Sequence, residues 1–363
     1  MNSILANFKK FDWALLASVF LISGWSLATI YYLSADADFL NFKKQLAFFV
    51  VSFLVMAAAS FFNYQIFRNQ PLFLVFIYGL ASVLLVLVLI FGQKIRGTTG
   101  WFSFAGINFA PVELVKLIII LILAKFFSQR YIELYRIRHL AISFAYVILP
   151  VFLVLLQPDL GSAFVLLAIW LGLVIVSGIK IRHLFIIILI GLVVAGIMWS
   201  GFLKDYQKKR IITFLNPQKD ALGQSYNLRQ SLIAIGSGKL FGKGLGKGTQ
   251  SQLKFLPEAH TDFIFAVIAE EWGFLGVIGL FLLFGVLLYR ILRIGFLSAN
   301  NFAKLFSFGI VIMLFVEILI NVGMNLGLLP VVGISLPFIS YGGSSALVNF
   351  LGLGILQSIR VRS

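Results

Sequence analysis

Apolar runs of roughly 20 residues recur along the whole chain, with short polar segments between them. A helix of this length spans the hydrocarbon core of a bilayer, which is about 30 Å thick. The pattern therefore predicts about ten transmembrane helices, all in one polytopic α-helical protein. Their expected ranges are 12–33, 43–62, 72–92, 112–127, 140–156, 160–178, 183–203, 263–290, 304–329 and 343–358.

The fifth and sixth helices are separated by the sequence LLQPDLGS at 155–162. Without a break, this apolar run would be too long to cross the membrane once, and Pro158 and Gly161 both interrupt helices. One long polar segment, 204–262, follows the seventh helix and is too short for a domain with its own core. We therefore expect a single integral membrane domain over 1–363, with 204–262 as a large extracytoplasmic loop.

The composition supports a membrane protein and excludes other classes. Hydrophobic residues make up 61% of the chain and charged residues 12%, which no soluble domain of this size would carry. The first apolar stretch, 13–33, is long for a signal-peptide core and has no small-residue cleavage site after it, so it predicts a first transmembrane helix. Cysteine is absent, which excludes disulfides, thiolate metal sites and a cysteine nucleophile.

The distribution of Lys and Arg predicts the orientation. An even number of helices places both termini on one side of the membrane. With the termini inside, the short inner segments hold 13 Lys and Arg and the short outer segments hold four, in agreement with the positive-inside rule. The formal net charge of +16 suits an anionic membrane surface or lipid substrate, and no soluble basic domain exists to bind nucleic acid.

The loop contains a glycine-rich stretch, IGSGKLFGKGLGKGTQSQL, at 235–253. It is not an ATP-binding P-loop, because Lys243 and Lys247 are each followed by Gly rather than by Ser or Thr. Two interpretations remain open. The stretch is either a solvated mobile loop, or its lysines, Lys239 included, bind the phosphates of a lipid.

Four polar residues gather just before the eighth helix, in the sequence FLPEAHTDFIF at 255–265. Asp262 or Thr261 could simply cap the helix. Capping needs one polar residue, however, and Glu258 and His260 are present as well. A partly desolvated carboxylate at the outer membrane boundary can have a raised pKa and act as a general base, so this cluster is a candidate catalytic site.

Further ionisable residues are predicted near the outer ends of helices. Glu113 and Lys116 are spaced i,i+3 and could form a structural ion pair or line a polar binding pocket. Asp159 lies in the helix break and could cap the next helix or line a polar cavity.

Two more sets of polar residues lie within predicted helices. Glu270 and Glu271 are neighbours on different faces of the eighth helix, so at least one should point into the bundle. Glu317, Asn321 and Asn325 recur every four residues and form one polar stripe on the ninth helix. Stripes of this kind more often make interhelical hydrogen bonds than carry out catalysis.

The last outer loop, GLLPVVGISLPFISYGGSS at 327–345, has two prolines and paired glycines. It is placed to face the long loop and includes Ser340 and Gly342. Together with QPDLGSA at 157–163 and the stretch from QSLIAIG to FAVIAEE at 230–271, this segment resembles the SEDS family of cell-wall polymerases, the RodA/FtsW/SpoVE group. The ten-helix layout matches as well, and GTQSQLKFLPE at 248–258 is most similar to RodA.

The resemblance implies a peptidoglycan glycosyltransferase that polymerises lipid II for cell-wall elongation at the outer face of the bacterial cytoplasmic membrane. It implies a class B penicillin-binding transpeptidase as partner and no tightly bound cofactor, with a divalent cation, Mg²⁺ or Mn²⁺, at the diphosphate as one option. Asp262 corresponds to the family's catalytic candidate. The expected substrate-binding residues are Glu113, Lys116, Asp159, Lys243, Glu258, His260, Thr261, Ser340 and Gly342.

The chain departs from the family pattern at 100–102, which reads Gly-Trp-Phe where Arg-Trp-Ile is usual, and at Asn108, where Arg is frequent. Lys94, Arg96 or loop lysines are the alternative cations. Two other functions stay open. Buried charges could serve a lipid flippase or transporter, although no inverted repeat is evident, and the chain could be a non-catalytic scaffold for a transpeptidase.

Overall fold

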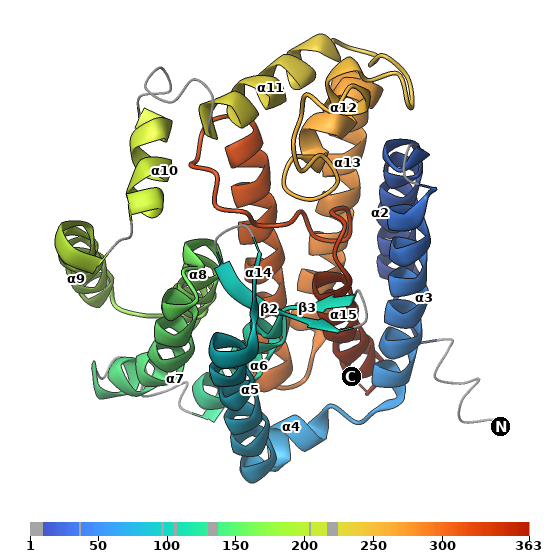
Figure 1. Ribbon diagram of the computed structural model, residues 1–363. Coiled ribbons are helices and arrows are strands. Elements are labelled where there is room, and N and C mark those ends of the chain that lie inside the picture. The colour runs from blue at the N-terminus through green and yellow to red at the C-terminus, as the bar shows by residue number, and fades with distance from the viewer. Residues whose placement is uncertain are drawn as a thin grey trace.

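The computed structural model describes residues 10–35, 38–95, 98–104, 107–129, 137–202, 205–215 and 224–362. Most of its helices form one bundle around a largely apolar core (Figure 1). All ten predicted helices are present. They are α2 (Trp13–Leu33), α3 (Leu40–Phe61), α5 (Pro71–Phe91), α6 (Pro111–Gln129), α7 (Ile137–Leu156), α8 (Leu160–Val176), α9 (Ile181–Ile197), α13 (Ile264–Leu297), α14 (Asn301–Asn325) and α15 (Gly343–Arg362).

Eight of these helices are long and apolar enough to cross a membrane. The other two, α6 and α8, have 19 and 17 residues and lie largely inside the bundle. Large apolar side chains on the outer helices face away from the core, among them Leu72, which is 82% exposed, and Phe185, which is 69% exposed. Such a surface is stable only against lipid, so the structure agrees with the expected membrane protein.

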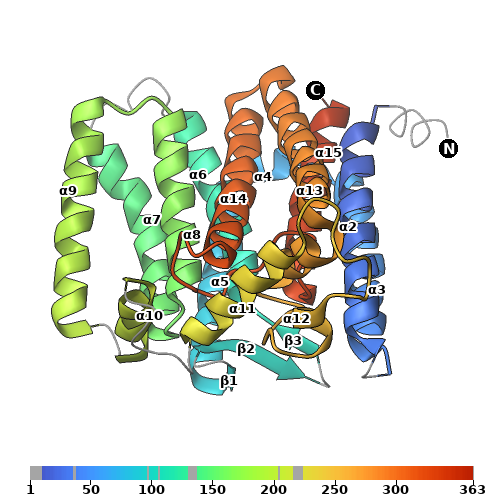
Figure 2. The ribbon, with the colours of Figure 1, turned by 90° about the horizontal axis from the view of Figure 1, so that it is seen from above.

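The two ends of the bundle differ. Helix α2 begins and α15 ends at one end, together with the short helix α4 (Gln65–Asn69), as Figure 2 shows. The opposite end carries most of the non-spanning structure (Figure 2). These elements are the strands β1 (Gln93–Ile95), β2 (Thr98–Phe104) and β3 (Ile107–Phe109), and the helices α10 (Asp205–Leu215), α11 (Gln224–Ser237) and α12 (Thr249–Gln252).

The strands form an antiparallel sheet in the order β1-β2-β3, which the sequence analysis did not predict. A backbone hydrogen bond from Thr99 N to Gln157 O, 3.3 Å long, joins β2 to the break between α7 and α8. A short π-helix at Met198–Phe202 ends the seventh predicted helix. The sheet and the loop helices therefore cover the end of the bundle where the candidate site residues lie.

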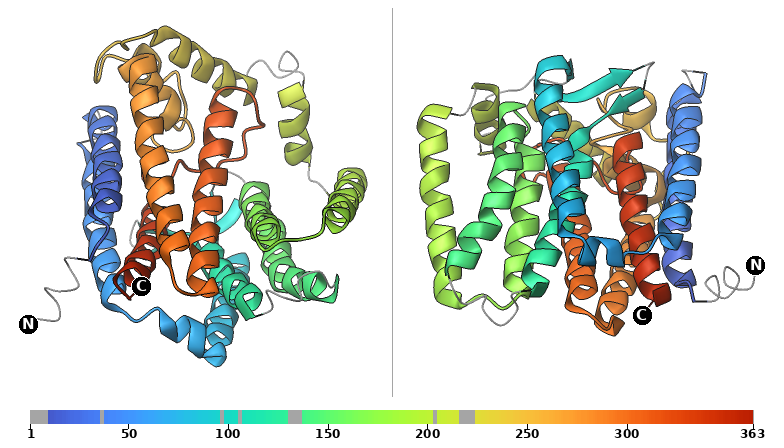
Figure 3. Two further views of the ribbon diagram at one scale, coloured as in Figure 1. Left: turned by 180° about the vertical axis from the view of Figure 1, so that it is seen from behind. Right: turned by 90° about the horizontal axis from the view of Figure 1, so that it is seen from below.

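Asp12 joins three helices at the other end. Its carboxylate accepts a hydrogen bond from Leu15 N at 3.0 Å, which caps α2, and pairs with Arg290 of α13 at 2.7 Å. Asp12 and Gln357 of α15 also exchange two hydrogen bonds, of 3.0 and 3.2 Å. These hydrogen bonds join the start of the first helix of the bundle to the last helix. The right view of Figure 3 shows the start of α2 and the end of α15 at the same end of the bundle.

Candidate active site

Asp262 lies in the turn that leads into α13, and its side chain is half-buried. The helix begins at Ile264, and Phe263 occupies the N-cap position without a capping side chain. Helix capping was the simplest role considered for Asp262, but Asp262 does not occupy the N-cap position.

The backbone of Asp262 is held by the polar stripe of α14. The side-chain amides of Asn321 and Asn325 donate hydrogen bonds of 3.1 and 3.0 Å to the carbonyl oxygen of Asp262. Both asparagines are fully buried and are fixed in turn, since Asn321 also binds Ile334 O at 2.8 Å and Asn325 O accepts from Ser231 at 2.8 Å. The stripe thus makes inter-segment hydrogen bonds, as the sequence analysis expected.

The two residues before Asp262 are fixed by the last outer loop. Tyr341 N donates to His260 O at 2.8 Å, and Ser340 Oγ donates to Thr261 O at 2.6 Å. Ser340 Oγ also accepts from Leu336 N at 2.8 Å. Burial raises the pKa of the Tyr341 phenol above its ordinary value, so the phenol is neutral near pH 7. Three successive carbonyls, at positions 260 to 262, are therefore fixed by residues from α14 and the 334–342 segment.

Gly333 leaves space beside the Asp262 carboxylate. Its φ of +77° favours glycine, and the place that a Cβ would take lies 3.6 Å from Asp262 Oδ2. On its other side, this loop contacts the start of α8, where a Cβ on Gly161 would come within 2.9 Å of Ile334. The QPDLG and LPVVGIS stretches, far apart in the sequence, thus lie against each other next to Asp262.

Asp159 caps α8. Its Oδ1 accepts from Ser162 N at 3.0 Å, and its Oδ2 accepts from Ser162 Oγ at 2.6 Å. This is the structural alternative that the sequence left open, and it uses both carboxylate oxygens.

The glycine-rich loop is folded around Glu270, which is 0% exposed. Its Oε1 accepts from Lys243 Nζ at 2.8 Å and from Gln250 N at 3.0 Å, while its Oε2 accepts from Ser251 N at 3.2 Å. Further hydrogen bonds come from the hydroxyls of Thr249 and Ser251. The stretch is therefore folded against α13 rather than fully surrounded by solvent.

Glycines let this loop lie directly on the backbone of α13. A Cβ on Gly238 would fall 1.9 Å from Ala269 O, and one on Gly242 would fall 2.2 Å from Glu271 O. Glu271 is also buried, and its Oε1 accepts from Gly246 N at 3.1 Å. Both glutamates of the eighth predicted helix thus point inward. Helix α13 itself breaks at Gly273, whose φ is +66°.

Lys116 lies deeper in the bundle between two carboxylates. Its ammonium is 2.8 Å from Glu113 Oε2 and also hydrogen-bonds to Glu317. Lys116 and Glu317 are each 2% exposed, whereas the Glu113 side chain is 14% exposed. The expected Glu113–Lys116 pair is present, and Glu317 is a third member that the spacing alone did not indicate.

The remaining candidate residues occupy the same end of the bundle. Glu258 is exposed with a φ of +55°, and its Oε2 accepts from Thr261 Oγ1 at 3.2 Å. Gly342 N donates to Gln45 Oε1 of α3 at 3.2 Å. The site is thus assembled from α3, α13, α14 and two loops.

Comparison with known proteins identifies the family. The FtsW/RodA/SpoVE model, described as cell cycle protein, matches residues 8–363. The chain belongs to this family. Among relatives, peptidoglycan glycosyltransferase MrdB of Escherichia coli is 38% identical, over 78% of this chain and 76% of its own length. The probable peptidoglycan glycosyltransferase FtsW of Haemophilus influenzae is 39% identical, over 78% and 72%.

A solved structure shows that the fold is shared by the family. It comes from a study of how a peptidoglycan synthase complex coordinates polymerization and crosslinking, and its matching chain has a TM-score of 0.81 at 32% identity. The match covers 96% of this chain and 97% of the other. This FtsW/RodA/SpoVE-family protein is therefore a polytopic membrane protein, as predicted.

The sequence of this family member does not indicate which residues fix the Asp262 segment through its backbone. Asn321 and Asn325 could be seen as a polar stripe, but their partner could not. For Gly333, the sequence showed only that it lies in 327–345, one of the stretches that resemble the family. For metals, the described residues contain no group of three or more His, Asp or Glu side chains that could hold an ion.

Proposed function

We propose that this protein is a peptidoglycan glycosyltransferase that polymerises lipid II into glycan strands for cell-wall elongation. The names of its relatives and its membership of the family support the activity. One structural observation carries the assignment of the site. The backbone on the N-terminal side of α13 is fixed at three successive carbonyls, and this places a half-buried Asp262 carboxylate at the end of the bundle.

In the proposed reaction, Asp262 accepts the proton of the acceptor GlcNAc 4-hydroxyl. The hydroxyl oxygen attacks the anomeric carbon of the donor MurNAc and forms the glycosidic bond. The bond from that carbon to the undecaprenyl diphosphate oxygen breaks, and the diphosphate leaves with the electron pair. A general base contributes typically about 10²- to 10⁴-fold to a rate, so the fixed backbone serves to hold the carboxylate at the reacting oxygen.

The leaving diphosphate needs positive charge nearby. Lys116 is buried between two carboxylates, and Lys243 is paired with Glu270. As they stand, both lysines serve the structure. We therefore assign the diphosphate contact to exposed lysines at this end of the bundle, Lys94 on β1 and Lys247 in the glycine-rich loop.

The proposal includes an orientation and a partner. The end of the bundle with the sheet and Asp262 would face outward across the bacterial cytoplasmic membrane, and the end with α4 and both terminal helices would face the cytoplasm. This agrees with the charge distribution of the short loops. The partner would be a class B penicillin-binding transpeptidase, a role supported by the related chain in a complex of polymerization and crosslinking.

The test is lipid II polymerisation by the purified full-length protein together with its transpeptidase. Asp262→Ala and Asp262→Asn are compared with wild type, and glycan strands are resolved on gels. Asp38→Asn is the matched control, because it removes an exposed carboxylate from the connection between α2 and α3 at the same end of the bundle. Thermal unfolding of each variant checks that it is folded.

We expect both Asp262 variants to lose at least about 100-fold in rate, as loss of a general base predicts, while the control keeps wild-type activity. Polymerisation by the Asp262 variants at the wild-type rate would refute the role of Asp262 and leave the enzyme class standing. A wild-type protein that makes no glycan with its partner would refute the enzyme itself and favour the scaffold or lipid-transport function.

A further inference from the structure

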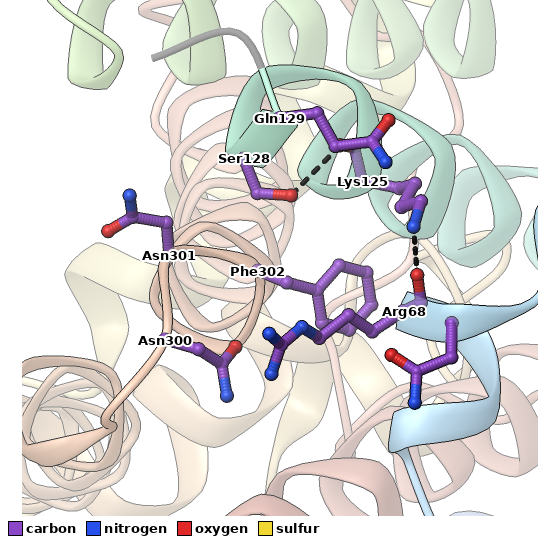
Figure 4. A pocket seen from close by; sticks show the side chains of 8 residues that line it. Arg68, Lys125, Ser128, Gln129, Asn300, Asn301 and Phe302 are labelled. Carbon is purple, nitrogen blue, oxygen red and sulfur yellow. Dashed lines mark hydrogen bonds between the residues drawn. The ribbon is translucent and has the colours of Figure 1, made fainter. Parts of the chain in front are cut away.

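A polar pocket lies at the end of the bundle opposite Asp262, with a volume of about 490 Å³. It is formed by α4, the end of α6, the connection between α13 and α14, and the start of α14 (Figure 4). Its lining residues are Arg68, Asn69, Lys125, Ser128, Gln129, Asn300, Asn301 and Phe302. None of them belongs to the candidate active site.

The pocket concentrates positive charge. The guanidinium of Arg68 and the ammonium of Lys125 both extend into it (Figure 4), and none of the eight lining residues is acidic. Within the described ranges, no carboxylate pairs with either cation. Elsewhere in the bundle the structure supplies such carboxylates, as for Lys116 and Arg290. Two like charges in one pocket repel each other, so an anion bound between them is electrostatically favoured.

The two cations retain hydrogen-bond donors for such an anion. Lys125 Nζ donates to the carbonyl oxygen of Arg68 (Figure 4), which leaves two of the three N–H groups of an ammonium. Arg68 is exposed and presents the five donors of a guanidinium, whose geometry matches the oxygens of a phosphate. The pocket therefore offers charged donors from two directions.

Neutral groups complete the lining. The exposed amides of Gln129 and Asn301 can donate further hydrogen bonds. Asn300 is already used, because its Oδ1 accepts from Ala303 N at 2.9 Å and its Nδ2 donates to Tyr64 at 2.9 Å. The ring of Phe302, 1% exposed overall, gives one apolar wall beside the guanidinium. This lining suits a charged group that carries a small organic substituent.

We propose that this pocket binds a phosphate group, either the phosphodiester of an anionic phospholipid head group or a soluble phosphate. It opens where transmembrane helices end, and basic pockets between such helices are typical sites for anionic head groups. The site is independent of the glycosyltransferase reaction, since it lies at the other end of the bundle and shares no residue with the reaction.

The test measures binding to the full-length protein in detergent at fixed ionic strength. The probes are dioctanoyl phosphatidylglycerol, the zwitterionic dioctanoyl phosphatidylcholine and inorganic phosphate. The variants are Arg68→Gln and the double variant Arg68→Gln/Lys125→Gln. The charge-matched control is Arg182→Gln/Arg293→Gln, which removes two exposed arginines on α9 and α13 that do not line the pocket.

Each cation near a membrane surface contributes about 1 kcal/mol to the binding of an anionic lipid, which is about fivefold in affinity. We therefore expect the single variant to lose about fivefold and the double variant about thirtyfold for phosphatidylglycerol, with the control near wild type. The single variant Arg68→Gln tests the proposal even if the double variant misfolds. It should fold normally, because no described residue hydrogen-bonds to the Arg68 guanidinium.

The probes separate the two sources. Binding of phosphatidylglycerol but not of inorganic phosphate, lost in the double variant, supports a lipid head group. Inorganic phosphate binding of similar strength, also lost in the double variant, supports a soluble ligand at the same site. Equal binding of phosphatidylglycerol by wild type and by both pocket variants, or an equal loss in the control, would overturn the proposal.

Discussion

Replacing Glu270 by glutamine tests whether one buried carboxylate holds the glycine-rich loop. The change keeps the shape of the side chain but leaves one oxygen and one NH₂ group. If the oxygen stays with Lys243 and Gln250, the NH₂ group faces Ser251 N, which is itself a donor. The reverse orientation places the NH₂ group against the Lys243 ammonium. Either way, at least one donor at the carboxylate loses its acceptor.

The expected cost follows from these contacts. A hydrogen bond to a charged group contributes about 1.5–3 kcal/mol, and a buried donor left without an acceptor costs about 1–3 kcal/mol. The Lys243 pair adds little, because the lysine side chain is 27% exposed and solvent screens such pairs to about 0–1 kcal/mol. The lost hydrogen bond and the unpaired donor together should destabilise the closed loop by about 3 kcal/mol. This raises the equilibrium constant for opening of the loop about 100-fold.

Amide hydrogen exchange of the purified protein, followed on peptides from 240–254, measures this opening directly. We expect about 100-fold faster exchange at Gln250 and Ser251 in Glu270→Gln, because their amide groups donate to the carboxylate. Lys247→Gln is the control, since it changes an exposed lysine in the same loop. Unchanged exchange in Glu270→Gln would show that backbone contacts with α13 alone hold the loop.

Three further predictions follow from the geometry. Lys116→Met leaves two carboxylates inside the bundle and should destabilise the protein by about 3–5 kcal/mol, measured by chemical denaturation in detergent; an unchanged stability would mean that one carboxylate is protonated. Asp159→Ala removes the α8 cap and should cost about 1 kcal/mol, and a loss of glycan synthesis in a still folded variant would instead show substrate contact. Gly273→Ala places a Cβ 2.3 Å from Gly242 N at positive φ and should cost more than about 2 kcal/mol in the same unfolding assay. Gly285→Ala, with open space around it, should be neutral or stabilising.

Most of the fold could be predicted from the sequence, because a membrane helix is defined by a local property, its apolar length. All ten helices were found this way, and the break at Pro158 was as well. The sheet at 93–109 could not be predicted, since its strands have only three to seven residues and β2 is anchored to a distant segment through Gln157. The same holds for the break of α13 at Gly273, which depends on the loop that packs against it.

The candidate site was predictable in part. The polar cluster before α13 and the Glu113–Lys116 pair are local patterns, and both are found where the sequence placed them. The partners were not predictable, because Asn325 and Ser340 reach the Asp262 segment across 63 and 79 residues of sequence. The packing of the glycine-rich loop could not be predicted for the same reason, since its contacts are made with a carboxylate on another element.

The polar groups of the bundle differ in the partners that they bind. Glu270 holds loop amides, Asp159 caps a helix, and Lys116 is enclosed by carboxylates, so each is accounted for by structure. At Asp262, the buried amides of α14 bind the backbone carbonyl, and Gly333 lies beside the carboxylate. Fixing a backbone so strictly is costly in conformational entropy and would be unnecessary for a side chain that only capped a helix. The arrangement supports the proposed general base, whose rate advantage would depend on a carboxylate held in one place relative to the reacting hydroxyl.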